Sequence, residues 1–188
     1  MNHLLPILAV CLAACASNDK PSSSGRVGAD SELGPTGNAI APYPFTPESI
    51  RERCIEGMVL TFRIVARGEQ PVFQYMRFYD WTEAAVNVEL RRESSTGKLL
   101  EPVSDQRETW TQLRNHAQFP SVATVRLREK LTTPAGEWNC WVYVVVGAEG
   151  GTTRFWFADQ LPGPPVLLDQ EQDGERIMRM ELIKVHLP

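Results

Sequence analysis

The histidine and acidic side chains of this chain are its best candidates for acid–base chemistry, but their spacing forms no catalytic motif. The sequence has no Gly-x-Ser-x-Gly elbow, no glycine-rich phosphate loop and no carboxylate pair at a fixed spacing. His116 lies near the end of an expected helix, where an imidazolium complements exposed carbonyl groups. Asp80, Glu83 and Glu108 are the acids that could reach it, and the sequence selects none of them. We therefore predict no catalytic residue and a protein that is not an enzyme. A hydrolase would need His116 within hydrogen-bond reach of an acid inside a cleft.

Metal and nucleic-acid chemistry are also not predicted. Beyond the N-terminal segment the histidines are His116 and His186, and no Cys-x-x-Cys or His-x-x-x-His spacing occurs. The formal net charge is −4, and the basic residues alternate with acidic ones without forming a stripe. We expect no metal, no other cofactor and no nucleic-acid partner.

The first fifteen residues have the features of an export signal. An apolar run that includes Leu4 to Val10 is too short to span a bilayer, and it leads into Leu12-Ala13-Ala14-Cys15. Those four residues resemble the lipobox of bacterial lipoproteins. The resemblance implies cleavage before Cys15, acylation of the Cys15 thiol and of the new amino terminus, and a permanent membrane anchor. Ala16 at the second mature position implies export to the outer membrane. The alternatives are a secretory signal cut near Ala14 or Ala16, or a short membrane anchor.

Composition then divides the chain into three parts. Residues 1–14 are the expected signal peptide, and residues 15–46 are the lipidated cysteine and a disordered tether rich in Ser, Gly, Pro and Ala. Residues 47–188 have the size of a single domain. In an oxidising compartment, Cys54 and Cys140 are the pair left to form a disulfide. The alternative is two buried free thiols that act as small apolar residues.

The domain is predicted to be mainly β, an α+β fold with a curved antiparallel sheet or half-barrel of about nine strands and one or two short helices. Thr46, Pro47 and Glu48 begin one helix, and Asp105 to Glu108 are expected to begin a second that ends before Pro120. The expected strands are 58–67, 72–81, 84–92, 99–103, 122–132, 137–146, 152–158, 166–172 and 175–186.

Two hairpins carry the register predictions. The turn at Asp173-Gly174 should place Glu171 opposite Arg176, Leu167 opposite Met180 and Leu168 opposite Arg179. A turn at residues 148–151 should place Val144 opposite Phe155 and Val142 opposite Phe157. Both faces of this second hairpin are then apolar, although an antiparallel sheet usually has one polar face. We expect both faces to be covered, and we select as ligand-binding candidates Trp141, Tyr143 and Trp156.

The segment from Phe155 to Val166 supplies a further candidate, Leu161, within a proline-rich crossing between strands. The crossing is either a rigid connector or a recognition loop at the rim of the sheet. Together with residues 135–140 and 154–157, this segment resembles uncharacterised envelope lipoproteins that are similar in layout to the unclosed β-barrels of the LolA and LolB carriers. The resemblance implies an apolar concavity for acyl chains, and no functional residue is carried over from it.

The leading hypothesis is an outer-membrane lipoprotein that binds a hydrophobic ligand or an envelope protein without catalysis. A structural or assembly lipoprotein without a ligand is the alternative, and an envelope hydrolase is a third. The first two differ in whether an apolar cavity exists.

Overall fold

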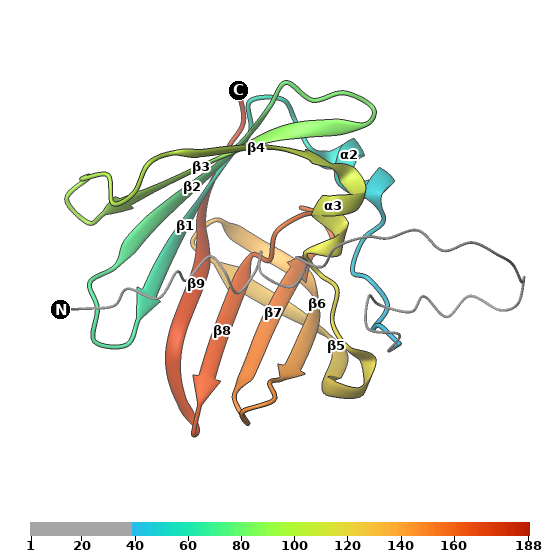
Figure 1. Ribbon diagram of the computed structural model, residues 1–188, viewed down its shortest axis with the longest axis vertical. Coiled ribbons are helices and arrows are strands. Elements are labelled where there is room, and N and C mark those ends of the chain that lie inside the picture. The colour runs from blue at the N-terminus through green and yellow to red at the C-terminus, as the bar shows by residue number, and fades with distance from the viewer. Residues whose placement is uncertain (1–38) are drawn as a thin grey trace, which may run out of the picture.

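The computed structural model describes residues 39–188, so the expected signal, Cys15 and most of the tether lie outside the described residues. Nine antiparallel strands form one curved, unclosed sheet in the order β4-β3-β2-β1-β9-β8-β7-β6-β5, with β4 and β5 at its two unpaired edges (Figure 1). The strands are β1 Val59–Ala66, β2 Val72–Tyr79, β3 Ala85–Ser94, β4 Ser104–Thr109, β5 Thr124–Thr133, β6 Gly136–Val146, β7 Thr152–Ala158, β8 Leu167–Gln172 and β9 Glu175–His186. The predicted mainly β fold with about nine strands is confirmed.

Two meanders build this sheet. Strands β1 to β4 form one and β5 to β9 form the other, because each strand pairs with its neighbour in sequence. The antiparallel pairing of β1 with β9 joins them, from Val59 opposite His186 to Ala66 opposite Met178. The concave side of the sheet holds two contacting helices, α2 and α3 (Figure 1).

The first helix begins as predicted. Helix α2, Pro47–Arg53, has Thr46 as its N-cap, and the Thr46 and Ser49 side chains each accept a hydrogen bond from the other residue's backbone N–H. Within residues 39–188, no helix has the length and hydrophobicity needed to cross a membrane.

The second helix begins later than predicted. Asp105 to Glu108 lie in β4, and α3 runs over Trp110–Asn115 with Thr109 and Gln112 as its capping box. The expected strand at residues 99–103 is wrong as well, since this segment makes only an isolated bridge between Leu99 and Glu93. The edge of β3 explains why the helix begins later than predicted. Hydrogen bonds to β3 satisfy the backbone groups of β4, and this pairing outweighs the local capping preference of Asp105 to Glu108.

The turn at Asp173-Gly174 sets the predicted register only next to itself. Both turn residues have positive φ, as a two-residue hairpin turn requires, and Glu171 lies opposite Arg176. A bulge between Gln170 and Glu171 then shifts the ladder by one residue. Leu168 therefore faces Met180 and Leu167 faces Glu181, so the other two predicted pairs are wrong.

The β6–β7 hairpin also differs from its predicted register by one residue. The Gly147 N–H donates to the Gly151 carbonyl at 2.8 Å, and Gly150 takes φ +84° in the shorter loop that results. Tyr143 therefore lies opposite Phe155, and Val142 lies opposite Trp156. The slip moves Trp156 to the face opposite that of Trp141 and Tyr143.

Both faces of this hairpin are covered, as the sequence predicts. One face contributes Cys140, Val142 and Trp156 to a core cluster that also contains Leu60, Phe62 and Leu182. The other face contributes to a second cluster, which contains four aromatic residues: Ala41, Ile64, Ala117, Phe119, Tyr143, Phe155, Phe157, Leu168 and Met178.

The described part of the expected tether packs on the domain. Ala41 is buried, its N–H donates to the Phe119 carbonyl at 2.8 Å, and the Tyr143 hydroxyl donates to the Pro42 carbonyl. Phe45 meets Phe157 edge to face at 6.1 Å. Residues 41–45, which composition assigns to the tether, therefore pack against the β-rich domain.

The expected disulfide is not formed, and both cysteines are buried free thiols. Cys54 follows α2, whereas Cys140 is paired with Glu129 and Ala158 in the sheet. Both belong to the same core cluster and serve as small apolar residues. Burial raises the pKa of each thiol to about 12.

We expect neither thiol to react with iodoacetamide in the folded protein at pH 8, because the reactive species is the thiolate. Unfolding in urea without a reductant should expose both groups to alkylation. Mass spectrometry of the peptides that contain Cys54 and Cys140 measures each site separately. If both remain unmodified after unfolding and become modified only after reduction, the two sulfurs are bonded.

Candidate functional site

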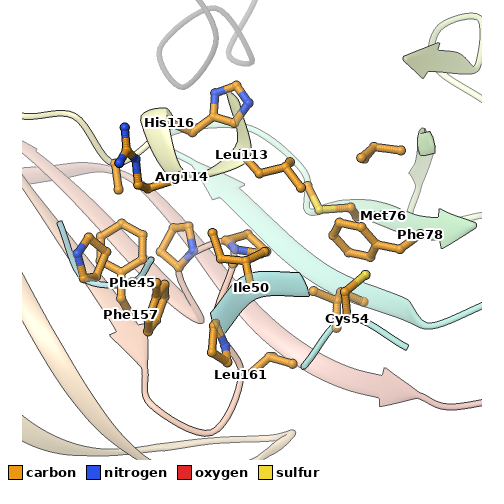
Figure 2. A pocket seen from close by; sticks show the side chains of 18 of the residues that line it. Phe45, Ile50, Cys54, Met76, Phe78, Leu113, Arg114, His116, Phe157 and Leu161 are labelled. Atoms are coloured by element: carbon orange, nitrogen blue, oxygen red, sulfur yellow. The ribbon is translucent and has the colours of Figure 1, made fainter. Parts of the chain in front are cut away.

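A cavity of about 130 Å³ lies between the concave side of the sheet and the elements that cover it. Helices α2 and α3, the segment before α2 and the β7–β8 connection form its cover, and Figure 2 shows Ile50 and Leu113 on opposite sides of it. Nearly all of the lining side chains are aliphatic or aromatic. Those from the strands are Met58 (just before β1), Leu60, Met76, Phe78, Val88, Leu90, Phe155, Phe157 and Met180, besides the polar Gln74.

The sheet register explains why these side chains meet. Leu60 of β1 lies opposite Met76 of β2, which in turn lies opposite Leu90 of β3. Opposed residues in an antiparallel sheet point to the same face, so the row forms a continuous apolar floor. Leu113 of α3 lies toward Met76 and Phe78 from the other side (Figure 2).

The candidate ligand residues have different positions relative to this cavity. Leu161 lines it, together with Pro162 to Pro165, so the proline-rich connection forms part of the rim as well as joining two strands. Tyr143 and Trp156 are buried in the two core clusters and do not line it. Trp141 is half-buried beneath Arg126 and Arg128, whose guanidinium carbons lie 4.0 and 4.4 Å from its ring. The three aromatic rings are therefore shielded, as expected, but they do not line this cavity.

Sequence reasoning missed the methionines of the floor. Met58, Met76 and Met180 come from three separate segments, and only the strand order brings them together. Alternation of apolar residues along β2 and β3 was the available signal, but it does not say which face is concave.

Four polar side chains also line the cavity: Gln74, Glu108, Arg114 and His116. Gln74 is buried, and its Oε1 accepts a hydrogen bond from Arg92 Nε at 2.9 Å. Glu108 and His116 meet at 2.7 Å between Oε2 and Nε2, with the carboxylate largely buried and the imidazole partly exposed. The structure thus selects Glu108 as the acid beside His116, whereas Asp80 pairs with Arg107.

This His–Glu pair meets the geometric requirement that we set for a hydrolase, but no side-chain hydroxyl nucleophile lies beside it among the described residues of the cavity. The described residues that line the cavity include no serine or threonine. Cys54 is the one thiol there, and burial raises its pKa to about 12, which keeps it protonated and unreactive. Among residues 39–188, no group of three or more His, Cys, Asp or Glu side chains is placed to hold a metal ion.

Two solved structures resemble this fold. One is a chain from "The complex structure of Pseudomonas aeruginosa MucA/MucB", with a TM-score of 0.50 and 10% sequence identity over 75% of this chain and 56% of that chain. The other is the hypothetical protein CT021 from Chlamydia trachomatis, with a TM-score of 0.47 and 8% identity over 74% of this chain and 91% of that chain. This chain therefore spans just over half the length of the Pseudomonas chain that it matches.

At this identity the similarity to the Pseudomonas chain establishes a shared β-rich fold and nothing further. No protein-family model and no curated protein matches the sequence. The resemblance to the LolA and LolB carriers is not confirmed and stays a prediction.

Proposed function

We propose that this protein is a non-catalytic, lipid-anchored protein of the bacterial envelope whose cavity binds an apolar ligand. The apolar cavity beneath α2 and α3 is the observation that carries the proposal. A dry cavity of about 150 Å³ accepts a molecule of the size of benzene. The space of about 130 Å³ therefore suits a small apolar group, such as the end of a hydrocarbon chain.

The flexible side chains of the lining favour a ligand that enters the cavity by displacing them. Met58, Met76 and Met180 are unbranched and polarisable, and such side chains adjust to irregular apolar shapes. Helices α2 and α3 contact each other, and the strands β1, β2 and β3 are paired with one another independently of the helices. A longer chain could be admitted by moving the helices while the strands keep their pairing.

Binding is tested with N-phenyl-1-naphthylamine, a probe that fluoresces in apolar surroundings. We expect wild-type protein to bind it and Met76→Trp, which fills the cavity, to weaken binding about tenfold or more. Tyr75→Trp is the matched control, because Tyr75 is the neighbouring residue and points to the other face of β2. Competition with palmitate then asks whether an acyl chain occupies the same space.

Two results of this titration would reject the cavity as the binding site. A wild-type protein that does not bind the probe would favour the structural or assembly lipoprotein without a ligand. Equal affinities in the wild type and Met76→Trp, with both proteins folded by circular dichroism, would place the probe elsewhere.

A protein partner is the second candidate function. The matched Pseudomonas chain was solved in a complex of two proteins, MucA and MucB, so a similar fold takes part in protein association. The hydrolase alternative has less support, because the Glu108–His116 pair lacks an accompanying nucleophile among the described lining residues.

A further inference from the structure

Strand β5 is the longer of the two unpaired edges of the sheet. It has ten residues, and β6 is its only ladder partner within the described part of the chain, whereas the opposite edge, β4, has six residues. The outward backbone groups of an edge strand are a template for another extended chain. Natural edges are usually short or covered, whereas β5 is long and, among the described residues, its central positions 127–130 are exposed.

One face of this edge has exposed apolar side chains, and Glu129 lies farther along the same face, where its carboxylate accepts a hydrogen bond from Trp156. Val125 is 62% exposed and Leu127 is 41% exposed on alternate positions of β5. Val122, which is 90% exposed, precedes the strand, and Val146 at the end of β6 is 51% exposed. We call these four residues the β5 apolar stripe. Isolated apolar side chains are common on surfaces, but a group of them on and beside an unpaired edge strand favours an interaction site.

The other face of the same strand is basic. Arg126, Arg128 and Lys130 alternate with the apolar residues and therefore point to the opposite side. Arg128 is paired with both carboxylate oxygens of Asp159, at 2.9 and 2.5 Å. Arg126 and Lys130 have no ion pair among the described residues, and Arg126 instead covers the rings of Trp141 and Tyr143.

The charge pattern also disfavours a second copy of this chain as the occupant. Antiparallel pairing of β5 with itself centred on Leu127 would place Arg126 against Arg128. Centring it on Arg126 or Arg128 would place two identical cations directly opposite each other. Like charges at opposed positions destabilise a sheet.

We propose that β5 binds an extended segment of a partner protein in which acidic residues alternate with apolar ones. The segment would add a tenth strand, with its backbone paired to β5, its acids facing Arg126 and Lys130, and its apolar side chains on the β5 apolar stripe. This surface is separate from the cavity, so the proposal does not depend on ligand binding there.

The test uses the full chain and two short fluorescein-labelled peptides, one alternating valine with glutamate and one alternating valine with lysine. At low ionic strength, where surface charges are least screened, we expect the wild type to bind the glutamate peptide and not the lysine peptide. Lys130→Glu and Arg126→Glu should each weaken glutamate-peptide binding about fivefold and strengthen lysine-peptide binding. Lys184→Glu, on an exposed position of β9, is the matched control and should change neither.

Lys130→Glu keeps the test decisive if Arg126→Glu disturbs the packing on Trp141. Equal affinity for the two peptides, no binding of either at millimolar concentration, or no response to Lys130→Glu would overturn the proposal. A concentration-dependent dimer in analytical ultracentrifugation that is abolished by Val125→Asp would show that a second copy is the occupant. Probe binding in the cavity should be unchanged in Lys130→Glu, so failure here leaves the proposed function intact.

Discussion

Replacing Trp156 with alanine is expected to lower the free energy of unfolding by about 3 to 5 kcal/mol, as measured by urea denaturation. The side chain is 7% exposed and lies within the core cluster of Cys140 and Val142. Its Nε1–H donates to a carboxylate oxygen of Glu129 at 3.2 Å. Alanine would remove the packing of the ring and leave the Glu129 carboxylate without this donor.

Trp81→Ala is the matched control. Trp81 is 39% exposed, and its one ring contact among residues 39–188 is edge to face with Trp110 at 6.4 Å. We expect a loss of about 1 kcal/mol there. A Trp156→Ala protein that loses less than this but no longer binds the naphthylamine probe would show that Trp156 contacts the ligand and is not a structural residue.

The second large effect is expected at Cys15. Cys15→Ser should move the protein from the membrane fraction to the soluble envelope fraction, because the acyl chains that hold it in the bilayer are attached at this thiol. Immunoblotting of the two fractions and the intact mass of the purified protein measure the change.

Cys11→Ser provides the control, since this cysteine would leave with the signal peptide. It should not change the distribution. A Cys15→Ser protein that stays in the membrane with the same N-terminus as the wild type would contradict the lipoprotein hypothesis.

The strands were predictable because alternation along each one is a local property. Residues 152–158 and 175–186 were predicted with the bounds that the structure has. Helix α2 was predictable for the same reason, since its start signals are consecutive: the N-cap Thr46, Pro47 at the first helical position and the first-turn acid Glu48.

The differences arise where a distant segment decides the outcome. Asp105 to Glu108 have a helix-capping pattern, but the unpaired edge of β3 makes them a strand. The bulge beside Glu171 and the shortened loop at Gly150 each move a ladder by one residue. A shift of one residue exchanges the two faces of a strand, so Trp156 was grouped with the wrong partners.

The candidate site was harder to predict than the fold. Its floor is made of side chains from β1, β2, β3, β7 and β9, which are separated in sequence, and its cover includes a loop and two helices. Leu161 was found because the proline-rich connection is unusual in composition. The contact between Glu108 and His116 could not be predicted, because the sequence pattern placed Glu108 at the start of a helix. In the structure Glu108 lies in β4, and α3 begins only at Trp110.

The pairing of β1 with β9 has a consequence for how the chain folds. Arg63 and Glu181 form an ion pair across this seam, although they are 118 residues apart in sequence. Each meander can assemble from neighbouring segments, but the seam requires the closure of a very long loop, and such contacts slow folding. Until it closes, β1 and β9 are two additional open edges that other unfolded chains can join. The joining of the two half-sheets is therefore the step at which correct folding competes with aggregation.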